Sequence, residues 1–565
     1  MTDVATPGQP SFPRRGPWAL VHDQSVLWLA WLILVVCVTL LNSQYENRIN
    51  PDATAYFSLA QKWARGAWLD GISGHWSPLF IWLIALGSKL GLSNITAVAI
   101  IDTMAGCVLL WSANRLICTS PLSNISRTIL LAAISLYALY FTFAAITPDL
   151  LMAALLTSYL ALSAEAPQTV RGLCMTGAVA GLAYLAKPIA LDFVLVHYCI
   201  TQMIGNRGVK APWTKILSNI GVVTGTMFLV AAPWVGCLWV KYHRFTLGTA
   251  GNNLLREMAP PFRAGGVVNI GLGAMPNPTA SNYWEHPDQL NLPAWSPLDS
   301  TYFSYFLDYV ETNAVVLIVT LSLISVLALP ILFYAVFRWW RGNTDPVVKS
   351  LVLAPLILSP VYCLFVITDR YLLPVVVWIL VLAARLIPPG RRSALVLSLV
   401  SLSFFPYAIL GLNDERHQGD AERQIARSLS ARLQLNGNAA SLAHWSRSLY
   451  VCYYAGLPYF GTPAASAPEG VLQELQRFHI RYFLVWRSDK IQSGLLGQMR
   501  LVTDNGVPPE LKIYEVPIPA ASAATSSALN RTLPIQQPRL LQNPPDFLRR
   551  RGLADEKPNL QARER

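Results

Sequence analysis

The stretch SPLFIWLIALGSKLGL, residues 77–92, decides how this chain is threaded through a membrane. A helix that crosses a bilayer needs roughly 17 to 25 residues. This stretch is apolar but slightly shorter, with Pro78 near its start and Lys89 near its end. Whether it crosses the membrane or lies on the surface fixes the side on which every later loop lies.

The composition of the chain is that of a membrane protein. Of its 565 residues, 53% are hydrophobic and only 13% are charged, and the mean hydropathy is +0.40. These values exclude a string of soluble domains. The formal net charge is +12. We nevertheless expect no nucleic-acid partner, because the Lys and Arg residues lie in small groups between apolar runs.

The eight cysteines do not form a recognisable framework. All except Cys452 lie in or beside apolar segments, and none has CxxC spacing. We therefore expect no disulfide framework, metal knuckle or redox pair.

Apolar stretches long enough to cross a bilayer occur about eleven times. They lie at residues 25–43, 96–117, 128–146, 149–165, 171–187, 189–205, 214–240, 312–337, 350–367, 371–387 and 393–412. The first stretch has no small-residue cleavage site behind it, which predicts a retained span after a cytoplasmic N-terminus at residues 1–24. Residues 25–412 are the expected transmembrane domain.

Basic residues allow a choice between the two topologies, because short cytoplasmic loops are enriched in Lys and Arg. If residues 77–92 lie on the membrane surface, a consistent series of basic groups falls on the cytoplasmic side. If they cross, every group from Arg115 onward falls outside. The groups are Arg14 and Arg15, Arg115 and Arg127, Arg171, Arg207, Lys210 and Lys215, Arg338, Arg341 and Lys349, and Arg385, Arg391 and Arg392.

We therefore predict a multi-pass protein of a bacterial inner membrane in which residues 77–92 lie on the outer surface. The first periplasmic loop, residues 44–95, then carries interfacial helices. A second, long periplasmic loop covers residues 241–311, and its proline and asparagine content is typical of a cap rather than a span.

The C-terminal part changes character and predicts a small periplasmic α/β domain at residues 413–519. Its shorter apolar runs indicate a strand at 448–454, a helix at 470–478 and strands at 481–486 and 511–516. Residues 520–565 are rich in Ser, Pro, Gln and Arg, and we expect this tail to be disordered.

Asp52 is the first candidate site residue. It follows Pro51 and is predicted to be the N-cap of an amphipathic helix whose apolar stripe contains Tyr56, Leu59 and Trp63. Helix capping alone would explain an isolated aspartate here. The functional interpretation depends on the other charged residues predicted to lie on the same side.

Four other outward turns each place an ionisable group at the membrane boundary. Each has a simpler explanation: His75 can be interfacial, Asp149 can cap a helix, Lys187 can extend to the interface, and Asp369 can pair with Arg370. Charges beside apolar spans are costly, however, and they tend to face protein interior or water-filled cavities. Together these groups indicate one shared site.

Six segments, in this order, resemble bacterial glycosyltransferases of the GT-C type. That superfamily includes the protein O-mannosyltransferases and the lipid A aminoarabinose transferase. The resemblance covers roughly residues 20–520, and each motif is short. The segments are NPDATAYFSLAQKWARG (50–66), GHWSPLFIWLIA (74–85), ITPDLL (146–151), GLAYLAKP (181–188), DRYLLP (369–374) and GVLQELQRFHIRYFLVW (470–486).

The resemblance implies a polyprenyl phosphate sugar as donor, used at the outer face of the membrane without a nucleotide. Asp52 then acts as the base or orients the acceptor, because a displacement with inversion needs a group that takes the acceptor proton. Asp149 matches the second acidic position. Lys187 and Arg370, with His75 as a third candidate, would hold the departing phosphate, where negative charge builds up.

The sequence also bears on a metal ion and on one departure from the aminoarabinose transferase. A divalent cation could bind at Asp52, Asp149 and His75, but no characteristic metal spacing is present. The aminoarabinose transferase also has an acidic and a basic residue just before the proline that corresponds to Pro78. Here these positions are Trp76 and Ser77, so that enzyme's metal and phosphate arrangement does not transfer directly.

The expected acceptor is a lipid, a glycan or a protein, and we expect membrane lipids around the spans.

Two other functions compete with sugar transfer. A transporter or flippase of a lipid-linked saccharide would place charges near the bilayer midplane in repeated halves, which the sequence does not show. A non-catalytic assembly or sensor protein would leave Asp52, Asp149 and Lys187 without a chemical role.

Overall fold

The computed structural model describes most of the chain between Pro17 and Pro517. The described ranges are 17–118, 122–164, 169–205, 212–259, 271–290, 292, 295–342, 344–387, 390–433, 435–465, 467–489, 493–503 and 509–517. The tail predicted at 520–565 and most of the predicted cytoplasmic N-terminus lie outside these residues.

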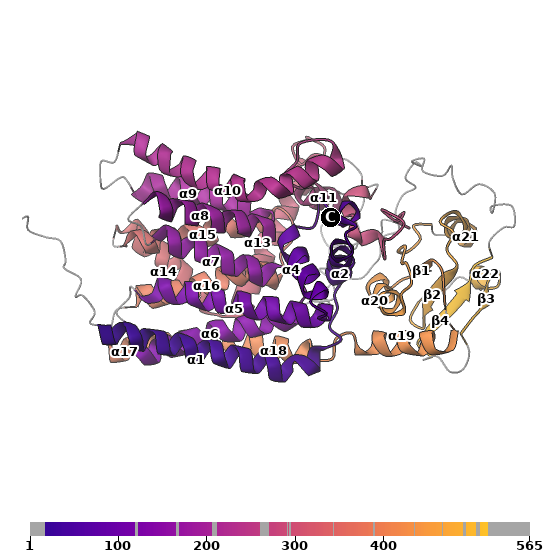
Figure 1. Cartoon of the computed structure of the whole chain (residues 1–565), viewed down its shortest axis with the longest axis horizontal. Coiled ribbons are helices and arrows are strands. Elements are labelled where there is room, and N and C mark those ends of the chain that lie inside the picture. The colour runs from indigo at the N-terminus through magenta and orange to yellow at the C-terminus, as the bar shows by residue number, and fades with distance from the viewer. Residues whose placement is uncertain are drawn as a thin grey trace, which may run out of the picture.

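The larger part of the molecule is a bundle of apolar helices that run side by side (Figure 1). Within the described residues, seven helices are long and apolar enough to cross a membrane, and further apolar helices are shorter. The bundle helices are α1 (Pro17–Leu41), α5 (Asn94–Cys118), α6 (Asn124–Ala144), α7 (Asp149–Ala164), α8 (Val170–Ala186), α9 (Ile189–Gly205), α10 (Trp213–Tyr242), α13 (Phe303–Ile324), α14 (Ala328–Trp340), α15 (Pro346–Cys363), α16 (Leu373–Leu386), α17 (Arg391–Leu402) and α18 (Phe405–Asp414). This confirms the predicted class, a polytopic helical membrane protein.

Two of the predicted spans are each divided into two helices. The stretch 312–337 forms α13 and α14, and 393–412 forms α17 and α18. Pro330 and Pro406 lie in the first turns of the second pieces, where their missing N–H groups cannot continue the hydrogen-bond pattern of the helix before them. The hydroxyls of Ser325 and Ser403, at the two breaks, lie 2.7 Å apart, so the breaks are neighbours in the bundle.

Helix α16 is the centre of the bundle. Every residue from Leu373 to Leu386 except Arg385 is buried, because other helices cover it on all sides. A short 3₁₀ turn, η4 (Asp369–Leu372), leads directly into it. The centre of the bundle therefore ends in a turn that carries two charged residues.

Three helices lie at one end of the bundle, which we call the loop end: α2 (Pro51–Ala64), α3 (Trp68–Gly71) and α4 (Pro78–Lys89). In Figure 1, α2 and α4 run across the direction of the bundle helices. A 12-residue helix such as α4 is ~18 Å long, shorter than the ~30 Å hydrocarbon core. The stretch that decides the topology is therefore a short helix packed against α2, with Tyr56 edge-on to Phe80 at 5.3 Å.

The segment 271–290 also lies at the loop end and is tied to α2. It contains η2 (Tyr283–Glu285) and η3 (Pro287–Gln289), and α11 (Ala250–Glu257) precedes it. Lys62 of α2 forms a buried ion pair with Glu285. Its Nζ also donates to the Asn277 side chain over 3.2 Å. The predicted loop 241–311 ends earlier than expected, because α13 begins at Phe303.

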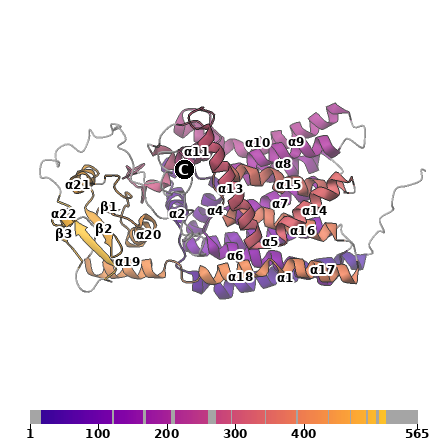
Figure 2. The ribbon, with the colours of Figure 1, turned by 180° about the vertical axis from the view of Figure 1, so that it is seen from behind.

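The C-terminal domain extends beyond the loop end in both views (Figures 1 and 2). Its four-stranded sheet has the order β1-β2-β4-β3, with β1 parallel to β2 and the other pairs antiparallel. Its elements are α19 (Asp420–Leu433), β1 (Ala439–Ser441), α20 (Trp445–Ala455), α21 (Pro468–Arg477), β2 (Tyr482–Trp486), α22 (Ser493–Leu496), β3 (Arg500–Leu501) and β4 (Leu511–Glu515).

One predicted element of this domain is wrong. Residues 448–454 form the middle of α20 rather than a strand, whereas the predicted helix at 470–478 and the strands at 481–486 and 511–516 correspond to α21, β2 and β4. The aromatic and β-branched residues favoured a strand. Ser448, Leu449, Val451 and Cys452 are nevertheless buried at helical spacing, because this face packs against the domain core.

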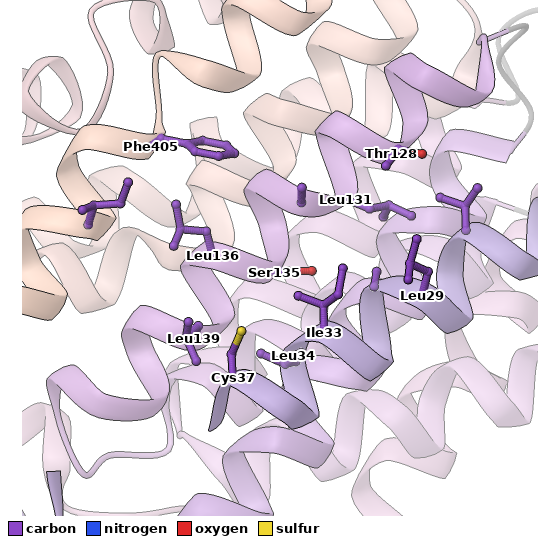
Figure 3. A pocket seen from close by; sticks show the side chains of 14 residues that line it. Leu29, Ile33, Leu34, Cys37, Thr128, Leu131, Ser135, Leu136, Leu139 and Phe405 are labelled. Carbon is purple, nitrogen blue, oxygen red and sulfur yellow. The ribbon is translucent and has the colours of Figure 1, made fainter. Parts of the chain in front are cut away.

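An apolar cavity of about 290 Å³ lies between α1, α6 and α18 (Figure 3). Of its 14 lining residues, Thr128 and Ser135 alone carry hydroxyl groups. Neighbouring residues of α1 such as Trp28 and Leu40 are exposed, so this side of the bundle faces lipid. The cavity is lined almost entirely by apolar side chains and suits hydrocarbon.

Candidate functional site

Charged residues from four separate parts of the chain meet at the loop end. Asp52 lies in the first turn of α2, Asp149 is the first residue of α7, Lys187 is in the turn between α8 and α9, and Arg370 is in η4. The sequence placed these residues on one side of the membrane. The tertiary structure brings them into contact.

The four side chains form a row in which charges alternate. One guanidinium nitrogen of Arg370 lies 2.9 Å from Oδ2 of Asp52, and its Nε lies 3.8 Å from Oδ2 of Asp149. The other oxygen of Asp149 pairs with the ammonium of Lys187. Asp149 is 2% exposed, whereas Lys187 and Arg370 are each about one-fifth exposed. The two cations are thus accessible to a ligand.

The sequence predicted Asp52 as the N-cap of α2, and this prediction is wrong. The N-cap is Asn50, whose side-chain oxygen accepts a hydrogen bond of 3.0 Å from the backbone N–H of Ile146. This bond connects the start of α2 to the turn before Asp149. Asp52 is the second residue of the helix, and its carboxylate is directed to Arg370 rather than to its own backbone. The positive end of the helix dipole still favours an anion here.

Asp369 does not pair with the side chain of Arg370, which was the simpler explanation of that dipeptide. Its Oδ2 accepts hydrogen bonds of 2.8 Å from the hydroxyls of both Tyr140 and Tyr407. Asp369 therefore fixes η4 to α6 and α18. Arg370 remains free to reach across to Asp52.

Aromatic rings line the row of charges. The ammonium of Lys187 lies 3.9 Å from the ring centre of Tyr371, and the guanidinium carbon of Arg370 lies 5.2 Å from it. Tyr371 in turn stacks on Tyr362 at 4.9 Å. Cation–π contacts of this kind hold both cations in place.

The charges of the site shift the pKa values of the neighbouring Tyr56 and of Arg370 itself. Burial raises the pKa of Tyr56, and the nearby carboxylates of Asp52 and Asp149 raise it further. Burial alone would lower the pKa of Arg370, but Tyr371, Asp52 and Asp149 outweigh it and raise that pKa. Arg370 is therefore a permanent cation.

Sequence reasoning missed the roles of Tyr56 and Tyr371. Tyr56 was assigned to the apolar stripe of α2, and Tyr371 was not singled out, although it directly follows Arg370. Both lie within motifs that were otherwise recognised. The available signal was position, because each lies within four residues of a charged site residue.

His75 lies near Asp52 but in an aromatic setting. Its ring is 4.4 Å from that of Trp76, and its Nδ1 is 3.3 Å from the side-chain nitrogen of Asn253. Burial lowers the pKa of His75 to about 4, although Asp52 opposes the shift. A contact between His75 and the donor phosphate remains a prediction. At neutral pH the imidazole of His75 would make this contact in its uncharged form.

The candidate metal ligands do not form a metal site. No group of three or more His, Cys, Asp or Glu side chains in the described part of the chain is arranged to hold a metal ion. Arg370, which is a cation, stands between the carboxylates of Asp52 and Asp149. The positions of Asp52, Asp149 and His75 therefore do not fit a resident divalent cation.

Trp284 of η2 lies beside Asp52. Its indole N–H points at Oδ1 of Asp52 over 3.5 Å, which is long for a hydrogen bond. Its backbone carbonyl accepts a hydrogen bond of 3.2 Å from the indole of Trp76. Asp52 thus has a cation on one side and aromatic rings on the other.

The sequence matches no protein-family model, and no curated protein matches it. Solved structures do match. A crystal structure of ArnT from Cupriavidus metallidurans bound to undecaprenyl phosphate has a TM-score of 0.51 and 13% identity, covering 88% of this chain and 98% of that chain. The apo state of the same protein gives 0.50 and 12%, with 88% and 97% covered.

A third match is a cryo-EM structure of the arabinofuranosyltransferase AftD from mycobacteria. Its TM-score is 0.40 and its identity 14%, and the match covers 90% of this chain and 42% of that chain. At identities this low, the similarity to ArnT shows a shared fold. It does not carry residue roles from one chain to the other.

Proposed function

We propose that this chain, which has the GT-C fold of ArnT, is a membrane glycosyltransferase that moves a sugar from a polyprenyl phosphate carrier to an acceptor hydroxyl. The observation that carries the proposal is the row of Asp52, Arg370, Asp149 and Lys187 at the loop end. It combines a carboxylate that can take a proton with two accessible cations that can bind phosphate.

The reaction is a displacement with inversion at the anomeric carbon. The acceptor oxygen forms a bond to this carbon while the bond from the carbon to the phosphate oxygen breaks. The acceptor proton passes to Asp52, and the electron pair of the broken bond leaves with the polyprenyl phosphate. Lys187 and Arg370 stabilise the charge that builds on this leaving group.

The pairing of Arg370 with Asp52 gives an order to these events. Before a donor binds, one oxygen of the Asp52 carboxylate is occupied by the guanidinium of Arg370 at 2.9 Å. A donor phosphate competes for the same guanidinium. Binding of the donor would draw Arg370 away and leave Asp52 available for the acceptor proton.

The donor class is supported by the similar structure of ArnT, which holds undecaprenyl phosphate. The periplasmic location of the loop end rests on the basic residues predicted to face the cytoplasm. The lipid tail would enter sideways between the bundle helices. A flippase is less well supported, because the charge row lies at the end of the bundle rather than near its middle.

Replacement of Asp52 by Asn tests the proposal. The probes are radiolabelled undecaprenyl phosphate sugars carrying glucose, mannose, galactose or arabinose, added to membranes of cells that express the protein. We expect transfer to fall by a factor of about 10² or more, with unchanged protein abundance. Asp299→Asn, at an exposed position shortly before α13, should leave transfer unaltered. Retained transfer in Asp52→Asn would overturn the catalytic assignment.

A further inference from the structure

Four aromatic side chains from three separate segments gather beside Asp52. We call His75, Trp76, Trp284 and Trp445 the aromatic wall. The ring of Trp284 is central, since it lies 6.2 Å from His75, 6.3 Å from Trp76 and 6.3 Å from Trp445. Trp445 belongs to α20, so the C-terminal domain supplies one side of this wall.

The ring of Trp284 is not stacked within the wall. Its contacts with His75, Trp76, Tyr283 and Trp445 have interplanar angles of 56°, 66°, 73° and 53°. By contrast, Tyr362 and Tyr371 beneath the charge row lie nearly parallel, at 14°. None of these contacts lays a ring flat on Trp284, and both Trp284 and Trp445 are half-buried. Trp284 packs against the hydrophobic clusters on both sides of it, and the part of each indole that is exposed can meet a ligand.

The wall carries little charge of its own apart from Asp52. The pKa of His75 is lowered to about 4, so its ring is neutral at physiological pH. Glu285, next to Trp284, is fully buried in its ion pair with Lys62. The cations of the site, Lys187 and Arg370, lie with Tyr371 in the charge row. The wall suits an uncharged ligand rather than a phosphorylated one.

An uncharged sugar ring has the matching chemistry. One face of a pyranose presents C–H groups that lose water favourably against an indole, while its edge carries hydroxyls. A ring stacked on Trp284 would place such a hydroxyl near Asp52, because the indole nitrogen is 3.5 Å from that carboxylate. The same hydroxyl would be the one from which the acceptor proton is removed.

We propose that the acceptor is a neutral saccharide that stacks on Trp284 and Trp445 with one hydroxyl at Asp52. This rests on the proposed function and narrows its acceptor from lipid, glycan or protein to a glycan or the sugar of a glycolipid. It also gives the C-terminal domain a role, since Trp445 lies on the first turn of α20.

The experiment measures saccharide binding to the full chain in lipid nanodiscs by saturation-transfer NMR. The probes are cellobiose, maltose, mannobiose and galactobiose, with a threonine-containing tripeptide as the alternative acceptor. We expect at least one disaccharide to bind and Trp284→Ala and Trp445→Ala to weaken it about tenfold. Trp284→Phe should recover part of the affinity. Trp340→Ala, which replaces an exposed tryptophan at the last residue of α14, should bind as the unmodified chain does.

Three results would overturn the inference: no disaccharide binds, the tryptophan variants bind as well as the unmodified chain, or the tripeptide alone binds. The outcome is separable from that of the proposed function. Asp52→Asn should abolish transfer yet keep disaccharide binding within about threefold, because Asn can still form a hydrogen bond there. If Asp52→Asn retains transfer while the tryptophan variants lose binding, the catalytic role fails and the saccharide site stands.

Discussion

The guanidinium of Arg370 lies 2.9 Å from the carboxylate of Asp52, although Arg370 lies in the turn before the buried helix α16 and Asp52 lies in the first turn of α2, across the end of the bundle. The pair joins the bundle to the helices that lie across its end. Both residues are partly exposed, so a ligand can reach the point where they meet. This contact and the ion pair of Lys187 with Asp149 can be tested by substitution.

Arg370→Lys should lower transfer about 100-fold, because a single ammonium cannot reach Asp52 and Asp149 together or bind a phosphate through two parallel hydrogen bonds. The measurement is kcat/KM with the labelled undecaprenyl phosphate sugar that the protein uses. Arg244→Lys, at an exposed position of the loop end, is the matched control. More than half of the activity remaining in Arg370→Lys would contradict a role in phosphate binding.

Lys187→Met should lower both stability and transfer, because it leaves the buried Asp149 without its closest partner. Removing one member of a buried ion pair costs ~3–5 kcal/mol. The double variant Lys187→Met with Asp149→Asn should regain most of the thermal stability but not the transfer. Recovery of transfer in the double variant would mean that Lys187 serves only to neutralise Asp149.

Asp369→Asn should retain more transfer than Asp369→Ala, because an amide oxygen can still accept the two tyrosine hydrogen bonds, although the NH2 group cannot accept the backbone N–H of Arg370 as Oδ1 of Asp369 does. Asp369→Ala removes the acceptor of one hydrogen bond from each of Tyr140 and Tyr407, at ~1–3 kcal/mol for each lost bond. Thermal unfolding and transfer are measured side by side. A large loss of transfer in Asp369→Asn at unchanged stability would point to a direct chemical role.

The stability of the protein should fall as the pH is lowered below about 6.5, and His286 should account for part of this loss of stability. Burial, helped by Lys241 and Lys62, lowers the pKa of His286 to about 3, below its value in an unfolded chain. Between these values the unfolded chain binds a proton that the folded chain does not. The loss from pH 6.5 to 5 is ~2 kcal/mol for this residue.

The measurement is the midpoint of thermal unfolding at several pH values. His286→Asn should show a shallower decline below pH 6.5 than the unmodified chain. His243→Asn is the control, because His243 is exposed and has a positive φ of 52°, which Asn tolerates. Identical pH dependence in His286→Asn and the unmodified chain would exclude this contribution.

Reporter fusions after Leu92 and after Asn413 should both be active on the periplasmic side. The reason is that α4 is too short to cross and the basic loops favour the cytoplasm. A fusion after Arg341, in one of the basic groups, should report the cytoplasm. A cytoplasmic reporter after Asn413 would reverse the proposed orientation of the site and of the C-terminal domain.

The sequence alone determined the helical membrane class, most of the spans and the set of candidate charges. These features are readable because hydropathy, helix length and loop charge are local properties of a segment in a bilayer. Residues 470–478 and 481–486 were likewise assigned correctly from their own periodicity. Asp52, Asp149, Lys187 and Arg370 could be placed on one side by counting spans.

The tertiary structure alone decided which of these groups meet. In the structure Asn50 is the N-cap of α2, and Asp369 accepts hydrogen bonds from two tyrosines. Residues 448–454 form part of a helix. The tertiary structure also brought Trp445 to Trp284. Local patterns could not predict these results, because the partner of each side chain comes from a distant segment, and packing against that segment outweighs local propensity.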